Sequence, residues 1–141
     1  MKKLFTGLIG AALLIGVLLL SLPAILHKWG LHPEYLGPTR TLPGKRALII
    51  TTSHGVLAAP GETEGAATGV FGSEMTHPYY TFLDGGMAVD IASIEGGEIP
   101  IDPSSFYFMI KTPEDERYLN DPIAQAKVKN SIPIADVDVE Q

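Results

Sequence analysis

The chain has 141 residues, with ten Lys and Arg and sixteen Asp and Glu, and a formal net charge of −6. This length leaves room for one domain at most once a targeting segment is subtracted. The sequence contains no cysteine, which excludes disulfides, thiolate metal sites and cysteine nucleophiles within it. Residues 47–141 hold four Lys or Arg against fifteen acids, a charge of about −11. That excess disfavours nucleic-acid binding, because phosphates attract the opposite charge.

A long uncharged segment opens the chain. Lys2 and Lys3 precede an uncharged run over residues 4–26, which predicts a helix of roughly 34 Å at ~1.5 Å per residue. Such a helix crosses a bilayer core of about 30 Å. The run contains four residues that membrane helices tolerate: Gly7, Gly10, Gly16 and Pro23. We therefore expect residues 1–28 to attach the chain to a membrane as an anchor or signal segment.

The end of this segment favours an anchor over a cleaved signal peptide. Small residues would suit a cut after Ala24, but Leu22 and Pro23 precede it. Lys2 and Lys3 favour a cytoplasmic N-terminus, whereas the basic residues that follow the segment favour the opposite orientation: Lys28, Arg40, Lys45 and Arg46. We expect a single pass with an extracytoplasmic soluble part, and we consider cleavage the weaker alternative.

A linker and a first strand come next. Three prolines within residues 29–45 block helix and strand pairing, so this stretch is a linker or an arm lying on the domain. Residues 46–51, RALIIT, predict a buried parallel strand. Residues 52–67 exceed an ordinary connection of about 2–6 residues, which predicts a functional or lid-like loop.

A helix and a second strand complete a βαβ unit. The helix is expected to start at Thr68 or Gly69, to kink or break at Pro78, and to end at a left-handed Gly85-Gly86 cap. Its apolar face would consist of Val70, Phe71, Met75, Tyr79 and Phe82. Residues 87–94 predict the second strand, which would pair in parallel with the first.

Two short helices follow. Thr112-Pro113 and Asp121-Pro122 each combine an N-cap residue with a first-turn proline, which predicts helices starting there. Beyond residue 130 the sequence predicts no element that closes the domain.

A series of motifs resembles a known family. Residues 68–79 fit T-G-V-F-x-x-E-x-x-H-P-Y and follow the strand-like ALIITTS. Four more matches come in order: Gly85-Gly86 before VDIAS, P-I-D-P-S at 100–104, L-N-D-P at 119–122, and S-x-P-I-A-D-V-D at 131–138. Over residues 46–141 the sequence resembles the ThiJ/PfpI superfamily, whose fold is class I glutamine-amidotransferase-like. Within it, the branch of heat-shock chaperones and glyoxalase III is most similar.

The resemblance implies an α/β fold, a partial flavodoxin-like parallel sheet with flanking helices, here preceded by one transmembrane helix. Carried over, Glu74 would be the helix glutamate that sits beside a catalytic cysteine and tunes its reactivity. In the family that cysteine, a Gly-Gly-His-Gly-type loop and a histidine come later than the positions matched here. Residues 46–141 would thus be the N-terminal half of the domain, inactive alone, with an open apolar edge at strand 46–51.

Other interpretations of single residues are weaker. Without the resemblance, Glu74 is most often a solvated side chain. His77 would cap or pack at the expected kink. Zinc ligation by His54, His77 and Glu62 or Glu64 fits the ligand types but no compact metal motif, so we expect no metal. No phosphate-loop motif is present, and we expect no cofactor.

Two hypotheses and a third alternative remain. In the first, the chain is part of a cysteine-dependent glyoxalase, hydrolase or chaperone that acts on small reactive carbonyls or damaged proteins, completed by a C-terminal half or a homodimer. In the second, it is a non-catalytic membrane-tethered interaction module whose open sheet edge pairs with a partner. In the third, it is a truncated product without a function of its own.

Overall fold

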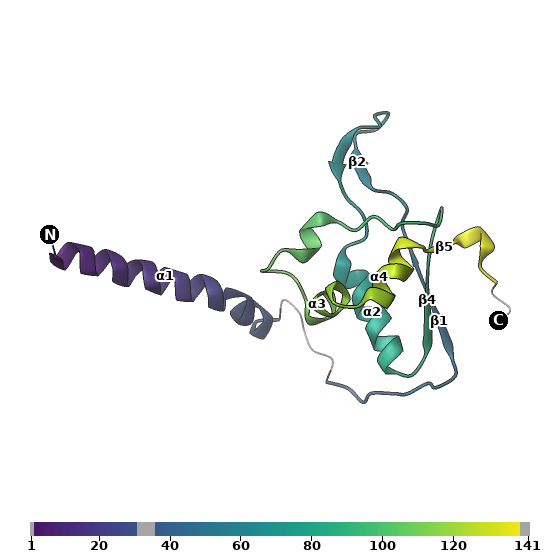
Figure 1. Ribbon diagram of the computed structural model, residues 1–141, viewed down its shortest axis with the longest axis horizontal. Coiled ribbons are helices and arrows are strands. Elements are labelled where there is room, and N and C mark those ends of the chain that lie inside the picture. The colour runs from purple at the N-terminus through teal and green to yellow at the C-terminus, as the bar shows by residue number, and fades with distance from the viewer. Residues whose placement is uncertain (1, 31–35, 139–141) are drawn as a thin grey trace. The chain divides into compact units, whose positions relative to one another are not determined.

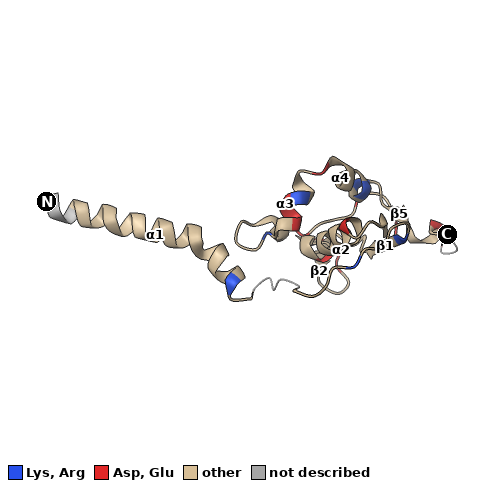
Figure 2. Cartoon of the chain, turned by 90° about the horizontal axis from the view of Figure 1, so that it is seen from below, with Lys and Arg blue, Asp and Glu red and all other residues tan. Residues whose placement is uncertain are grey.

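The computed structural model describes residues 2–30 and 36–138, and of residues 2–4 only the backbone. The described chain divides into two units, one up to Gly37 and one from Pro38 onward. The first unit contains helix α1, Lys2–Lys28, with Pro23 inside it. Its segment Phe5–Lys28 has a mean hydropathy of 2.6, which suits a membrane span and equally a signal sequence. Figure 2 shows the contrast between the largely uncharged α1 and the second unit, which carries charges of both signs.

The second unit is built on a parallel three-stranded sheet. The strand order is β1 (Arg46–Thr51), β4 (Ala88–Ser93) and β5 (Ile132–Pro133). β1 pairs with β4 along its whole length, whereas β5 pairs only with the last two residues of β4. Together with the helices described below, this sheet confirms the expected α/β fold class (Figure 1).

Helix α2, Gly72–Asp84, connects β1 to β4 and packs against both strands. Helices α3 (Pro113–Leu119) and α4 (Pro122–Lys129) pack next to it, α3 against α2 and α4 against β4 (Figure 1). The hydrophobic core lies between these helices and one face of the sheet. It consists of Ile49, Met75, Tyr79, Tyr80, Val89, Ile91, Ile99, Tyr118, Ala124 and Val128.

Both short helices start where the N-cap residues predict. The Thr112 hydroxyl accepts a hydrogen bond from the Asp115 N–H, and the Asp115 carboxylate accepts one from the Thr112 N–H, which completes a capping box. The Asp121 carboxylate accepts hydrogen bonds from the N–H groups of Ile123 and Ala124. Each cap satisfies donors that the first helical turn leaves unpaired.

The region between β1 and α2 differs from the expectation. Residues 52–67 were expected to be a loop, but they contain an antiparallel hairpin of β2 (Val56–Ala58) and β3 (Gly65–Ala67). The hairpin explains why this connection is long. The helix begins at Gly72, later than Thr68 or Gly69, because Val70 forms a parallel bridge with Ile101.

Proline and glycine act on α2 in different ways. Pro78 lies inside one continuous helix, so the expected break is wrong. The end of α2 is confirmed, although the left-handed residue is Gly86, with φ of 82°, and Gly85 is right-handed. Met87 N–H then donates to the Phe82 carbonyl, and the chain turns into β4.

The segment that follows α4 is also more ordered than expected. β5 joins the sheet, and a 3-10 helix, η2, follows over Ile134–Asp136. The Ser131 N–H donates to the Gly97 carbonyl, and the Gly97 N–H donates to the Ser131 carbonyl. This pairing of distant segments brings residue 132 beside β4. A local sequence pattern cannot indicate such a strand, because the strand depends on a contact with a distant segment.

The described residues just before β1 lie on the domain as an arm. The Leu42 N–H donates to the Gly85 carbonyl at 2.7 Å, and the Ala88 N–H donates to the Lys45 carbonyl at 3.0 Å. Residues 38–45 therefore run along the turn between α2 and β4. Prolines suit this extended path because they need no strand partner.

Strand β1 is half covered. Ile49 points into the core and is 9% exposed, whereas Leu48 and Ile50 are 37% and 53% exposed. In the described part of the chain, β1 pairs with β4 alone, so its second side forms an edge of the sheet. The expected open, apolar edge is present in this part of the molecule.

The alternation along β1 leads to a prediction. Ile49→Lys places a charge in the core and should lower the free energy of unfolding by roughly 3–5 kcal/mol. Ile50→Lys places the same side chain on the uncovered face and should change it by less than about 1 kcal/mol. Urea denaturation of the full chain in detergent measures both. Equal losses at the two positions would contradict this register.

Candidate functional site

Glu74 lies in the first turn of α2, at the carboxyl-terminal side of the sheet. α2 follows β1 through the hairpin, so its N-terminal end lies at the edge where β1 and β4 end (Figure 1). Ligands of open α/β sheets bind in this place. The partial positive charge of the helix N-terminus also favours a carboxylate there.

The side chain of Glu74 is exposed. Within residues 5–30 and 36–138, no side chain forms a hydrogen bond or an ion pair with it. Its carboxylate is thus open to a group that the described residues do not supply. The expected role of Glu74 beside a sulfur atom remains a prediction, because the chain contains no cysteine.

The start of α2 is fixed by two other segments. The Gly72 N–H donates to the Ser105 hydroxyl at 2.8 Å, and the Thr76 hydroxyl donates to Asp115 Oδ1 at 2.8 Å. Ser105, Thr76 and Asp115 are all fully buried. A Cβ atom at residue 72 would lie 3.0 Å from both Ser105 Cβ and Asp115 Oδ1. The absence of a side chain at Gly72 therefore allows this close approach, which positions Glu74 two residues later.

Two of the family-like motifs meet just before α2. The Val70 N–H donates to the Pro100 carbonyl at 2.9 Å, and the Asp102 N–H donates to the Val70 carbonyl at 3.0 Å. A Cβ atom at Gly69 would lie only 2.1 Å from the Pro100 oxygen. T-G-V-F and P-I-D-P-S thus form one structural unit around the start of α2. Both motifs were recognisable from the sequence, but their contact was not predicted. The signal for it was Gly69, because a residue without a side chain allows another segment to come close.

Asp102 stabilises the turn in P-I-D-P-S. Its Oδ1 accepts hydrogen bonds from the Ser104 hydroxyl at 2.5 Å and from the Ser104 N–H at 2.8 Å. Both hydrogen bonds hold the pKa of the Asp102 carboxyl below its ordinary value, and the bond from the Ser104 hydroxyl has the larger effect. Asp102 therefore caps the 3-10 helix η1, Pro103–Phe106, and its carboxylate has a structural role in this turn.

His77 contacts an acidic side chain on the same exposed side of α2. Its Nε2 lies 2.9 Å from Glu114 Oε2, and both side chains are well exposed. His77 caps no helix end, because α2 continues past it, and its expected packing at a kink stays a prediction. In the parts of the chain that the structure describes, no three His, Asp or Glu residues cluster as metal ligands, so the zinc alternative has no geometric support.

A second polar group lies where β4 ends. The Ser93 and Ser131 hydroxyls are 2.8 Å apart and buried, Ser93 Oγ accepts from the Gly96 N–H, and Ser131 Oγ donates to the Gly97 carbonyl. Sequence reasoning did not single out either serine. Their hydrogen bonds go to each other and to the backbone, which indicates a structural role in joining β5 to β4.

A groove of about 600 Å³ lies away from Glu74, beside the first residues of β1. Among its lining residues is Asp90, which accepts hydrogen bonds from Arg46 at 3.1 Å and from Lys127 at 2.8 Å. The bond from Lys127, helped by the one from Arg46, holds the pKa of the Asp90 carboxyl below its ordinary value. The groove is further lined by Lys45, Leu48, Ile132 and Val137.

No family model matches the chain, and no curated protein matches it. Solved structures do match. The chain is similar to Rapid Encystment Protein 24 kDa (REP24) of Francisella tularensis, with 38% identity and a TM-score of 0.58, over 68% of this chain. It is also similar to glyoxalase III of Candida albicans, with 25% identity and a TM-score of 0.53, over 67% of this chain. The chain spans 40% of the length of the first protein and 38% of the second.

These likenesses support the ThiJ/PfpI superfamily. The second neighbour carries the name glyoxalase III, one of the proteins in the branch that the motifs indicated.

The buried carboxylate of Asp115 leads to a prediction. Asp115→Ala removes an acceptor shared by Thr76 and Thr112 and should lower the free energy of unfolding by about 2–4 kcal/mol. The matched control is Glu116→Ala on the same helix, which removes an ion pair with Lys111 and a long hydrogen bond from Asn120 at the surface. That change should cost about 1 kcal/mol or less. Thermal or urea denaturation of both variants measures the difference, and similar losses would contradict a special role for Asp115.

The ion pairs of Asp90 predict a pH dependence. Because its folded-state pKa lies below the unfolded value, they stabilise the fold above that value, about 3.9, and are lost as the pH falls through the folded pKa. Asp90→Asn should therefore cost about 0.2–1 kcal/mol at pH 7 and nothing at a pH where the wild-type carboxyl is protonated. Urea denaturation across this range tests it, with Asp136→Asn, an exposed acid of the same groove, as control.

Proposed function

We propose that the chain is the membrane-anchored N-terminal portion of a ThiJ/PfpI-type protein, in which Glu74 supports a cysteine nucleophile supplied from outside these residues. The observation that carries the proposal is the position of Glu74. Its exposed carboxylate lies at the carboxyl edge of the sheet, on a helix start that Ser105 and Asp115 fix. A side chain held in this way can meet a group that completes the site.

The chemistry of this pair follows from the carboxyl group. A carboxyl beside a thiol can exchange a hydrogen bond with the sulfur and thereby change the fraction of thiolate. The thiolate is the nucleophilic form, and an electrophilic carbonyl carbon suits it as a target. The name of the glyoxalase III neighbour makes small reactive carbonyl compounds the substrate class to test first. Hydrolysis or a chaperone activity remains within the proposal.

We propose that α1 is the anchor. Its apolar length suits a membrane span, and Leu22 and Pro23 disfavour cleavage before residue 25. The soluble part would then lie outside the cytoplasm, since Lys2 and Lys3 favour a cytoplasmic N-terminus.

A second candidate is a non-catalytic interaction module. The edge position of β1 favours it, because β1 pairs with β4 alone in the described residues and an unpaired strand edge can add a strand from a partner. The partner would be a complementing C-terminal half or a second copy of the chain. In the third alternative, a truncated product, neither activity nor pairing would be found.

The first test is activity of the chain alone. The purified full chain in detergent should not consume methylglyoxal, because no residue in it can act as the cysteine nucleophile. Consumption is followed by loss of the dicarbonyl over time. Clear turnover by the wild-type chain would overturn the proposal.

The second test adds a candidate complementing part. The chain is co-expressed with the part of REP24 that it does not span, and co-purification and methylglyoxal consumption are measured. Glu74→Gln should leave binding intact and lower the rate roughly 10²-fold or more, the scale of a positioned acid–base group. Glu62→Gln, at another exposed glutamate, is the control and should leave the rate unchanged. Binding without activity in the unaltered pair would favour the interaction module.

A further inference from the structure

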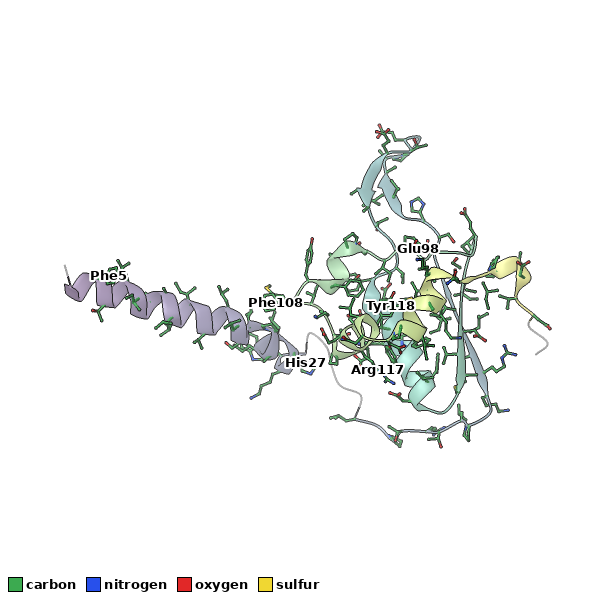
Figure 3. The ribbon with its side chains drawn as sticks, in the orientation of Figure 1. Phe5, His27, Glu98, Phe108, Arg117 and Tyr118 are labelled. Carbon is green, nitrogen blue, oxygen red and sulfur yellow. The ribbon has the colours of Figure 1, made fainter. Side chains whose placement is uncertain are left out.

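A short loop of the folded unit exposes three successive apolar side chains. Tyr107, Phe108 and Met109 are 64%, 58% and 41% exposed, and they belong to an uncharged run over residues 103–110. Single exposed apolar residues are ordinary, but a contiguous group of them with two aromatic rings marks an interaction site. Figure 3 shows Phe108 at the margin of the folded unit, whereas Tyr118 lies inside it.

Both ends of this loop are held by buried groups. On one side, the Phe106 ring stacks on the Tyr118 ring with centroids 6.1 Å apart. On the other side, Thr112 is buried in the capping box of α3. Within the loop, the N–H groups of Ile110 and Lys111 donate to the Tyr107 carbonyl at 3.0 and 2.9 Å. The fold therefore presents these apolar side chains on a defined turn.

We propose that Tyr107, Phe108 and Met109 insert into the interfacial region of the bilayer that α1 spans. The inference rests on the membrane anchoring proposed above. Aromatic side chains, and tyrosine in particular, suit this depth, because an apolar ring lies in the acyl boundary and a polar group stays in water. The loop would hold the folded unit against the membrane in one orientation.

The tether makes this contact easy to reach. Fully extended, residues 29–37 span at most about 30 Å, so the folded unit stays close to the membrane surface. A short tether raises the effective concentration to the millimolar range, and weak apolar contacts then suffice. The excess of acids over residues 47–141 opposes anionic lipids, so the contact depends on apolar insertion into a zwitterionic surface.

The experiment uses the single tryptophan of the chain, Trp29. The double variant Trp29→Phe/Phe108→Trp moves the indole to the loop, and the full chain is reconstituted into phosphatidylcholine vesicles with or without brominated acyl chains. The matched control is Trp29→Phe/Leu57→Trp, because Leu57 is 68% exposed and lies on the hairpin that also carries Glu62 and Glu64. Emission and lipid flotation are measured on the same samples.

The indole at position 108 should emit at shorter wavelength in vesicles and lose most of its emission to brominated lipid, and the indole at position 57 should do neither. Equal quenching at both positions, or none at 108, overturns the inference while flotation still supports the anchor. A shorter-wavelength emission at 108 without bromine quenching shows contact with protein, and this also overturns it. A chain that does not float with the vesicles overturns both the inference and the anchoring.

Discussion

The buried carboxylate of Asp115 joins the parts of the folded unit that determine its shape. One oxygen accepts the Thr76 hydroxyl of α2, and the other accepts the N–H and hydroxyl of Thr112 at the start of α3. A buried polar group is tolerated where hydrogen bonds replace those it loses to water, and here three donors do so. Asp115 therefore fixes α2 to the start of α3, and the hydrogen bonds of Val70 and Gly72 to the P-I-D-P-S segment and Ser105 fix the start of α2 on its other side, next to Glu74.

The same arrangement leaves one side of the sheet less covered. α2, α3 and α4 bury Ile49, Val89 and Ile91 on one face, while Leu48 and Ile50 stay partly exposed on the other. Doubly wound sheets bury both faces under helices. Asp90, which pairs opposite Leu48, lies on this less covered side, and its partly exposed ion pairs with Arg46 and Lys127 contribute little to stability. An exposed Glu74 and an exposed sheet face therefore both favour a structure that contacts further protein.

Local signals predicted a large part of the fold. β1 and β4 were recognisable from short apolar runs, and the starts of α3 and α4 from Thr112-Pro113 and Asp121-Pro122, because caps act within one turn of helix. The hairpin of β2 and β3 was missed, since its strands are three residues long and rich in alanine and glycine. The start of α2 was misplaced because Val70 pairs with Ile101, which is distant in sequence. At the candidate site, Glu74 and its motif were found from sequence, but the supporting Ser105 and Asp115 were not, because their hydrogen bonds join separate motifs.

The amino-acid sequence alone indicates the apolar N-terminal helix, the acidic character of the folded part, the absence of a cysteine and the motif that contains Glu74. These are properties of composition and of residues close together in the chain. The three-dimensional contacts alone show that P-I-D-P-S lies against T-G-V-F, that Gly72 leaves little room for a side chain beside Asp115, and that Tyr107 to Met109 are exposed on a fixed turn. The first two depend on contacts between segments about thirty or more residues apart, which follow from the path of the whole chain. The third depends on the packing of Phe106 against Tyr118 and on the capping box of α3.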